Sequence, residues 1–318
     1  MDELQSKQGT NCAMKVNIQS KELRFDYQFQ CQNSGIIAVT GNSGSGKSNL
    51  LNALAGFNEN FSGAIEFRKG KATTLNQCAY MNQQPVLFDH WTVKENLEFT
   101  KKYNKKPYDE LIKTLQCETL LNKYPQQLSG GEKQRIAFIR TIIQIKNKGL
   151  AIFDEPFSAL DINRRKIALA IIQSLKNCLI FYVSHDVSEL YQIADELMLV
   201  EKGKIHYHAC INVAMSQGKS NLPLASRIII DEVEHVIFAN DVSISLKQNP
   251  LSSIQHQWPA QIAEIKTVYS HVLLKLTLNK SSHSQCLLAS ITHESFKKLK
   301  LGLHQHVVAN FKALAYSP

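Results

Sequence analysis

A phosphate-binding loop is predicted near the N-terminus by a glycine-rich run of eight residues: Gly41, Asn42, Ser43, Gly44, Ser45, Gly46, Lys47 and Ser48. Glycines at this spacing let backbone N–H groups surround the β and γ phosphates of a nucleotide. The lysine adds a positive charge, and the serine hydroxyl is placed to bind Mg²⁺. Residues 36–39 form an apolar run typical of a strand buried on both faces, and apolar residues recur at helical spacing after the loop. Strand, loop and helix together predict a nucleotide-binding site.

Three polar side chains follow two further apolar runs. Asp154 and Glu155 follow residues 150–153, and His185 comes soon after residues 179–183. Both runs are typical of buried strands, and ligands bind at the carboxyl ends of the strands of parallel sheets. In a nucleotide enzyme the first carboxylate can hold Mg²⁺, the second can orient and deprotonate the attacking water, and a histidine can reach the γ phosphate. The alternatives are solvated turn acids and a structural histidine.

A second glycine-containing segment, residues 128–135, has the sequence Leu-Ser-Gly-Gly-Glu-Lys-Gln-Arg. Ile136, Ile139 and Ile143 recur behind it on one face of a predicted helix. Ser129 is placed as the N-cap of that helix. Paired glycines at a helix start are by themselves a weak sign of an anion site, because ordinary caps look alike.

These segments need a sheet to position them. Predicted helices over residues 164–175 and 187–194 separate the apolar strands in βαβ order, which predicts a parallel sheet. Residues 15–31 and 63–71 predict antiparallel strands that form a small side sheet. After a further short strand, helical spacing predicts a helical insert in the middle third of the chain.

Six side chains on predicted strands have two interpretations each. Phe25 or Tyr27 could stack on an adenine ring, although a strand aromatic packs in the core more often. Two pairs of alternating histidines could bind a metal, although solvated histidines are the stronger interpretation without a carboxylate or cysteine at ligand spacing. These pairs are His206 with His208 and His304 with His306.

The composition is that of a soluble protein with about two domains. The 318 residues are 44% hydrophobic and 20% charged, without an apolar run that could cross a bilayer. Residues 1–14 form a polar extension without the apolar core of a signal peptide, so we expect a cytoplasmic chain that starts at Met1 or Met14. Seven cysteines without a CxxC spacing predict reduced thiols. The net charge of +9 comes without a Lys/Arg block interleaved with aromatics, so nucleic acid is not expected as a partner.

The order of these motifs resembles that of the ATP-binding cassette (ABC) ATPases over roughly residues 15–205. The resemblance makes residues 41–48 the Walker A loop, Gln83 the Q-loop glutamine, Asp154 the Walker B ligand of Mg²⁺, Glu155 the catalytic base and His185 the switch histidine. It also assigns the signature residues Ser129, Gly130, Gly131 and Gln134, the D-loop residue Asp161, and Ser48 and Gln83 as further Mg²⁺ ligands. It implies ATP as the nucleotide and a head-to-tail homodimer in which each signature closes over the other chain's ATP.

Residues 252–318 have a different pattern, with short alternating segments that predict a small β-barrel. This part is similar to the molybdate-binding Mop domain, of the OB-like TOBE type, that follows the ATPase in molybdate importer subunits. The resemblance assigns Ser253, Ser290, Thr292 and Lys312 to an oxyanion site. Gln255 and His256 stand where that family has Arg and Asn, which predicts weak molybdate binding that strengthens if His256 becomes protonated.

The sequence therefore predicts an α/β P-loop cassette over residues 15–210, with a mostly parallel sheet, a helical subdomain and an antiparallel side sheet. A linker and truncated regulatory segment follows over 211–251, and then the barrel. The expected function is ATP hydrolysis for an oxyanion importer, most consistent with molybdate. The resemblance implies integral-membrane permease subunits, a periplasmic or extracellular substrate-binding protein and a place at the cytoplasmic face of the inner membrane. The alternatives are sulfate, iron or polyamine import, a soluble ABC ATPase, and an oxyanion-storing or sensing protein.

Overall fold

The structure of the chain is a computed structural model. It describes residues 12–32, 34–58, 60–67, 70–71, 78–101, 108–145, 149–175, 177–217, 224–230, 233–249, 254, 256–267, 271–278 and 285–311. The chain forms two compact units, Met1–Asp186 with Ile193–Ala209, and Val187–Gln192 with Cys210–Pro318. Among the helices in the described ranges, none is long and apolar enough to cross a membrane.

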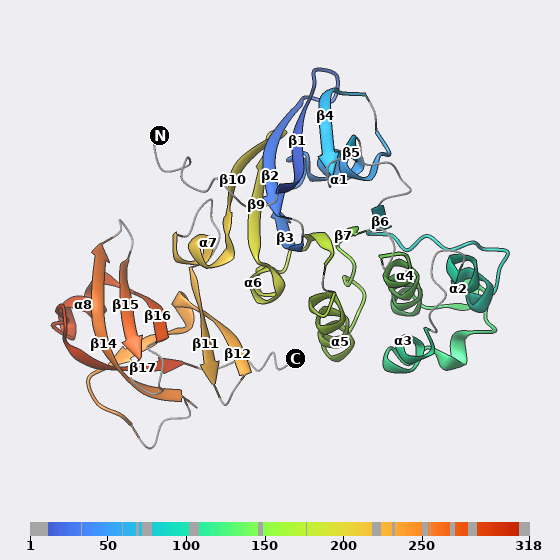
Figure 1. Cartoon of the computed structure of the whole chain (residues 1–318). Coiled ribbons are helices and arrows are strands. Elements are labelled where there is room, and N and C mark those ends of the chain that lie inside the picture. The colour runs from blue at the N-terminus through green and yellow to red at the C-terminus, as the bar shows by residue number, and fades with distance from the viewer. Residues whose placement is uncertain are drawn as a thin grey trace. The chain divides into compact units, whose positions relative to one another are not determined.

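The first unit is built on one ten-stranded sheet with the order β5-β4-β1-β2-β10-β9-β3-β8-β7-β6 (Figure 1). The strands are β1 (Cys12–Ser20), β2 (Phe25–Gln32), β3 (Gly35–Thr40), β4 (Ser62–Phe67), β5 (Gly70–Lys71), β6 (Cys78–Met81), β7 (Leu150–Asp154), β8 (Leu179–Val183), β9 (Glu196–Glu201) and β10 (Lys204–Cys210).

The pairing within this sheet confirms a parallel part and an antiparallel part. Strand β3 pairs in parallel with β8 and β9, and β7 pairs in parallel with β6 and β8. Strand β1 pairs antiparallel with β2 and β4. The side strands are not a separate sheet, because β2 continues into the parallel part through β10, with Asp26 opposite Lys204.

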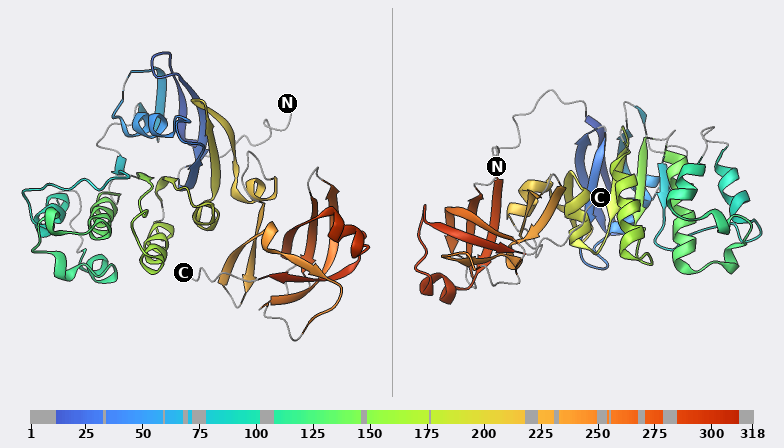
Figure 2. Two further views of the ribbon diagram at one scale, coloured as in Figure 1. Left: turned by 180° about the vertical axis from the view of Figure 1, so that it is seen from behind. Right: turned by 90° about the horizontal axis from the view of Figure 1, so that it is seen from below.

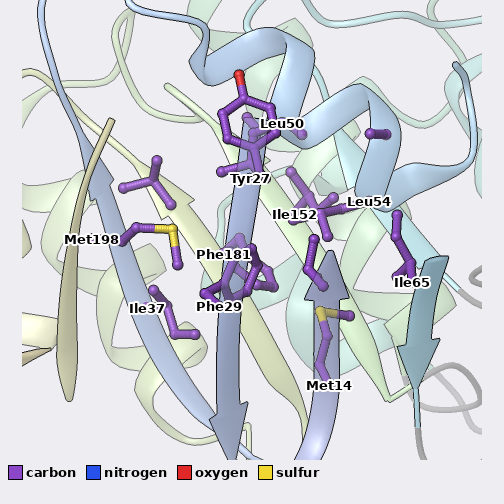
Figure 3. Packing of buried hydrophobic residues seen from close by; sticks show 14 of the residues in the cluster. Met14, Tyr27, Phe29, Ile37, Leu50, Leu54, Ile65, Ile152, Phe181 and Met198 are labelled. Atoms are coloured by element: carbon purple, nitrogen blue, oxygen red, sulfur yellow. The ribbon is translucent and has the colours of Figure 1, made fainter. Parts of the chain in front are cut away.

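Helix α1 (Lys47–Ala55) packs into the core between the two parts of this sheet (Figure 3). Its apolar face contributes Leu50 and Leu54, which are fully buried. Ile152 and Phe181 come to the same core from β7 and β8, which are apolar along their length because both faces of these strands are covered. Met14 is also fully buried, in β1.

The remaining helices of the first unit are α2 (Val93–Lys101), α3 (Asp109–Thr114), α4 (Gly130–Ile145) and α5 (Ile162–Gln173), whereas all of α6 (Val187–Ile193) except its last residue belongs to the second unit. Helices α2, α3 and α4 gather on one side of the first unit, apart from β1, β2 and β4 (Figure 1 and Figure 2). They form the helical insert that the sequence predicts. Helices α5 and α6 follow β7 and β8 and complete the crossovers of the parallel sheet.

In its described residues the second unit contains a five-stranded curled antiparallel sheet with the order β13-β17-β14-β15-β16, a hairpin β11-β12 and two helices in addition to α6. Its elements are α7 (Ile211–Gln217), β11 (Ala225–Ile230), β12 (Val233–Phe238), β13 (Ser243–Ser245), β14 (His256–Thr267), β15 (Val272–Leu278), β16 (Gln285–Ile291), α8 (His293–Lys298) and β17 (His306–Phe311). The segment 211–251, set apart as a linker by its sequence, carries α7, the hairpin and β13 in its described residues. Because β13 pairs with β17, this segment belongs to the same unit as the C-terminal sheet.

Candidate nucleotide-hydrolysis site

The predicted phosphate loop connects β3 to α1, and its backbone is one that only glycine accommodates at two positions. Gly41 has φ 145° and Gly46 has φ 107°. A Cβ atom at Gly41 would lie 2.2 Å from the carbonyl oxygen of Val200, and one at Gly46 would lie 2.6 Å from the hydroxyl of Tyr27. Glycine is therefore required at both positions by backbone conformation and by space.

Hydrogen bonds within the loop, from the turn between β9 and β10 and from β2 hold the loop in place. The N–H of Ser45 donates to the carbonyl of Asn42 at 3.1 Å, and the carbonyl of Ser45 accepts from the N–H of Gly203 at 2.8 Å. The hydroxyl of Tyr27 donates to the carbonyl of Gly46 at 2.7 Å. Ser43 and Gly44 are exposed at the tip, and Ser48 is exposed in the first turn of α1.

Lys47 folds back over this loop. Its Nζ atom donates to the carbonyl of Gly41 at 2.6 Å and to that of Asn42 at 3.1 Å. Burial lowers the pKa of Lys47, while Glu155 and Asp154 act in the opposite direction. The lysine therefore lies within electrostatic reach of both carboxylates, and the loop, the cation and the acids belong to one site.

Asp154 ends β7, next to the loop. Burial raises the pKa of its carboxyl group, and the neighbouring charge of Glu155 raises it further, whereas Lys47, a hydrogen bond from Tyr80 and His185 lower it. Burial also raises the pKa of Tyr80, so its hydroxyl remains a hydrogen-bond donor to Asp154. Two adjacent acids in a half-buried position are an arrangement that a bound cation stabilises.

Glu155 contacts two side chains, Gln83 and His185, that the sequence also assigns to ATP hydrolysis. Its Oε2 atom accepts from Nε2 of Gln83 at 3.0 Å, and its Oε1 atom lies 2.7 Å from Nε2 of His185. The carboxylate is 17% exposed, whereas the histidine side chain is 66% exposed. The backbone of Glu155 has φ 46°, and its N–H donates to the carbonyl of Val183 at 3.0 Å. The structure thus brings residues from β6–α2, β7 and β8 together at the carboxyl ends of the strands.

The signature segment forms a second cluster with the D-loop. Ser129 and Glu132 cap α4 reciprocally, since the N–H of Ser129 donates to Oε2 of Glu132 at 2.7 Å and the N–H of Glu132 donates to Oγ of Ser129 at 3.3 Å. Gln134 is almost completely buried, and it bonds Oγ of Ser158 and the N–H of Ala159. This amide ties the signature helix to the loop that follows Glu155.

The two glycines of the signature and the last D-loop residue belong to this same cluster. Gly131 lies so close to the D-loop that an added Cβ atom would be 3.0 Å from the carbonyl oxygen of Ala159, whereas Gly130 is exposed. Asp161 caps α5 by accepting from the N–H of Arg164 at 3.0 Å, and its Oδ2 atom pairs with the guanidinium of the same residue at 2.6 Å. Ser129 itself is exposed at the start of α4.

The structure decides between the interpretations of Phe25 and Tyr27 in favour of core packing, and it corrects the expectation for His208. Phe25 and Tyr27 are 4% and 0% exposed and stack on each other with ring centroids 4.8 Å apart, so they pack in the core and offer no face to adenine. His208 is not a solvated histidine, since its Nε2 atom lies 2.6 Å from Oε2 of Glu196 and its ring meets Phe29 edge-on. His206, His304 and His306 are exposed as expected. No cluster of three metal-binding side chains is found among the described residues.

The predicted oxyanion residues are only partly within the described ranges. Ser253 and Lys312 lie outside them, as does Gln255. Ser290 is half-buried in β16 opposite Leu273. Thr292 caps α8 by accepting from the N–H of Ser295 at 3.1 Å, so its hydroxyl already has a structural partner.

Comparison with known proteins places this geometry in a family. Residues 25–158 match the family model described as ABC transporter, and residues 252–315 match that of the TOBE domain. A relative from Saccharophagus degradans is 30% identical over 336 residues, covering 88% of this chain and 91% of its own length. The chain therefore belongs to the ABC transporter family of ATP-binding proteins.

That relative is a molybdenum import ATP-binding protein, ModC. ModC proteins of Mannheimia succiniciproducens and Haemophilus influenzae are 28% and 27% identical, and each alignment covers 95% of this chain and 99% of the relative. Among solved structures, an ATP-binding subunit of an ABC transporter shares the fold, with a TM-score of 0.58 and 22% identity over 64% of this chain and 92% of the other. A dimeric ATP-binding cassette in a post-hydrolysis state with ADP and phosphate has a TM-score of 0.55 and 20% identity over 63% of this chain and 99% of the other.

Proposed function

We propose that this chain is the ATP-hydrolysing subunit of an importer that takes up molybdate. The observation that carries the proposal is Glu155, held between Gln83 and His185 beside Asp154 and the Lys47 loop. Molybdate as the substrate is supported by the similarity to ModC proteins along nearly the full length of both chains. A sulfate, iron or polyamine importer is the second candidate, because the same ATPase geometry would serve it.

The residues of the site have distinct roles in this proposal. Residues 41–48 bind the ATP phosphates through backbone N–H groups, and Lys47 exchanges its loop carbonyls for phosphate oxygens. Glu155 accepts a proton from the attacking water, and this makes the water oxygen a stronger nucleophile toward the γ phosphate. His185 and Gln83 hold Glu155 in its orientation, and the exposed side of His185 remains free to reach the γ phosphate.

The donor set at the end of β7 fits Mg²⁺. Asp154, Ser48 and the carbonyl oxygen of Gln83 offer only oxygen atoms, which this cation prefers. The raised pKa of Asp154 indicates a carboxylate that lacks a compensating charge of sufficient size. When bound, Mg²⁺ would neutralise charge on the β and γ phosphates.

The exposed signature supports a head-to-tail homodimer. Ser129, Gly130 and Gly131 begin α4, Gln134 ties that helix to the D-loop, and Asp161 caps the next helix. We infer that this face of one chain covers the ATP of the other. The D-loop then links hydrolysis at Glu155 in one chain to the signature contact of the same chain.

An exposed aromatic cluster on the helical insert supports a permease partner. Phe88 and Phe99 are 43% and 45% exposed, and both rings contact Trp91. The fully buried Asn96 holds this surface in shape, because its amide donates to the carbonyls of Phe88, Trp91 and Thr92 and accepts from the N–H of Phe88. We infer that integral-membrane permease subunits dock here, a few residues after Gln83, at the cytoplasmic face of the inner membrane. A substrate-binding protein on the other side would deliver molybdate.

For the domains, we propose a polar extension over residues 1–14, a cassette over 15–210, a regulatory segment over 211–251 and a Mop-like domain over 252–318. Ser253, Ser290, Thr292 and Lys312 stay the proposed oxyanion ligands of that last domain. The capping role of Thr292 limits what its hydroxyl can offer to an anion.

Uptake by cells whose own gene carries Glu155→Gln would test the substrate. We expect accumulation of radiolabelled molybdate to fall to background, with uptake of sulfate, iron and polyamines unchanged. The matched control is Glu66→Gln, an equivalent change at an exposed strand position. Loss of another substrate's uptake would replace molybdate with that substrate, and unchanged uptake of all of them would contradict the transport proposal.

A further inference from the structure

A cavity of about 570 Å³ lies within the C-terminal unit, and its lining includes neither Ser290 nor Thr292 of the predicted oxyanion residues. Its walls are α7, the hairpin β11-β12 and the face of β14, β15 and β16 that is turned away from the core. This volume is within the range of sites for small organic ligands. The cavity has no role in the function proposed above.

The strand register explains why the cavity is lined by charge. On β15 the core residues Leu274 and Leu276 alternate with Leu273 and Lys275, so the latter two point to the cavity side. The same register sets Glu264 of β14 opposite Lys275. The apolar residues of these strands face the core of the unit, so the charged side chains lie together on the opposite face, which lines the cavity.

The lining carries both signs of charge, with one positive charge in excess. Arg227 donates to the carbonyl of Tyr191 and its Nη1 atom lies 4.0 Å from Oε2 of Glu234, which fixes this pair on the hairpin wall. Lys275 faces Glu264 across the strands. Lys266 lies opposite the apolar Leu273, so the sheet wall holds two lysines and one carboxylate.

We propose that this cavity binds a small amphoteric molecule, an acidic amino acid such as L-glutamate. Its carboxylates would meet Lys266 and Lys275, and its ammonium group would meet Glu264. A net charge of −1 balances the excess positive charge of the lining. A doubly charged oxyanion is a poorer match, because it offers no donor to the two carboxylates and is repelled by both. Met215 and Leu288 supply apolar contact for the methylene groups.

Cys286 gives this site a built-in reporter. Its thiol lines the cavity, and burial raises its pKa, with Glu264 acting in the same direction and Lys275 in the other. Cys210 is also an exposed free thiol but is not part of the cavity lining. A bound ligand should therefore shield Cys286 from a thiol reagent and leave Cys210 reactive.

The test is maleimide labelling of the full chain, followed by mass spectrometry of the two thiols. We expect saturating L-glutamate to slow labelling of Cys286 by about tenfold and to leave Cys210 unchanged. Glutarate has the same two carboxylates without the ammonium group and should protect at least about tenfold less well, the size of a lost charge-assisted hydrogen bond. Equal protection by glutarate, protection by molybdate or sulfate, or no protection by any of these probes would each overturn the proposal.

Two variants check that protection comes from the proposed contacts. Lys266→Ala and Glu264→Gln should each weaken L-glutamate binding by about tenfold, measured by calorimetry on the full chain. Both positions are exposed on the sheet, so the fold should tolerate them. Lys297→Ala, an exposed change in α8 outside the cavity, is the matched control and should leave binding unchanged.

Discussion

The nucleotide site and the predicted oxyanion site differ in how the strands position their residues. At the nucleotide site the loop, the acids and His185 each follow a parallel strand directly, so the sheet delivers them to one edge. At the C-terminal site the two assigned residues that the structure describes are Ser290, near the end of the antiparallel strand β16, and Thr292, which serves as a helix cap. Residues that each follow a parallel strand come together at one edge of the sheet, so the nucleotide site is the more sharply defined of the two predictions.

The largest expected effect is that of Glu155→Gln, which tests the chemistry of the nucleotide site. If the carboxylate is the base of the nucleotide site, ATP hydrolysis should slow by on the order of a hundredfold or more, with ATP binding retained and a nucleotide-bound dimer trapped. Turnover is measured by phosphate release and the dimer by light scattering. Glu66→Gln should leave both unchanged, and a normal turnover of Glu155→Gln would remove Glu155 from this role.

The second prediction tests whether the nucleotide site needs a second chain. Ser129→Arg and Lys47→Ala should each lose more than about nine-tenths of the ATPase activity, because a dimer of either variant has no complete site. An equal mixture should recover about a quarter of the wild-type rate, since about half the dimers are mixed and each has one complete site. Full activity of Ser129→Arg alone, or no recovery on mixing, would contradict the shared site.

The third prediction concerns the loss of folding stability caused by the charged Asp154 at the end of β7. Burial and Glu155 raise the pKa of Asp154 in the folded chain. Such a group stabilises the fold fully below its unfolded pKa, about 3.9, and loses this contribution as pH rises through the folded value. Asp154→Asn should therefore raise the Tm of the nucleotide-free chain at pH 7, with the difference vanishing near pH 4, as measured by calorimetry.

The matched control for that prediction is Asp161→Asn, because this residue is shifted in the opposite direction. The backbone N–H and guanidinium of Arg164 hold the pKa of Asp161 below its usual value. Its contribution is present above the unfolded pKa and is lost as pH falls through the folded one. Asp161→Asn should lower the Tm at pH 7, and a rise like that of Asp154→Asn would show that burial is not the cause.

The smallest expected effect belongs to the C-terminal unit. Thr292→Ala removes the N-cap of α8 and should cost about 1 kcal/mol of stability, while Thr292→Ser should cost much less. Urea unfolding measures both. If Thr292 is a cap alone, molybdate affinity should be the same in the two variants and the wild type. A loss of affinity in Thr292→Ala that Thr292→Ser restores would return the hydroxyl to the oxyanion site.

The sequence predicted which residues of the nucleotide site follow a strand, but it did not predict the contacts that support those residues. Lys47, Asp154 and Glu155 are fixed by local motifs, since each follows a strand in the chain. The hydrogen bond from Tyr80 to Asp154 depends instead on the register of β6 against β7, with Tyr80 opposite Ile152, which local sequence does not contain. The carboxylate partner of His208 likewise comes from the neighbouring strand, at Glu196.

The C-terminal unit shows the same limit on a larger scale. The short alternating segments of residues 252–318 predicted strands, and β15, β16 and β17 are among them because one face of each strand is apolar. Nothing in residues 243–245 indicates that they pair with β17 as the strand β13. That pairing is set by contacts distant in sequence, and it moves the boundary of the unit.

The left-handed backbone of Glu155 has a consequence for how this chain can evolve. A φ of 46° is costly for a residue with a Cβ atom, on the order of 1–3 kcal/mol, and glycine or asparagine would adopt it more easily. The acid is thus kept at this position against the preference of the backbone. A duplicated copy released from ATP hydrolysis should drift to Gly or Asn here early and gain stability by doing so. The residue at position 155 would therefore distinguish copies that still hydrolyse ATP from copies that do not, before the other motif residues change.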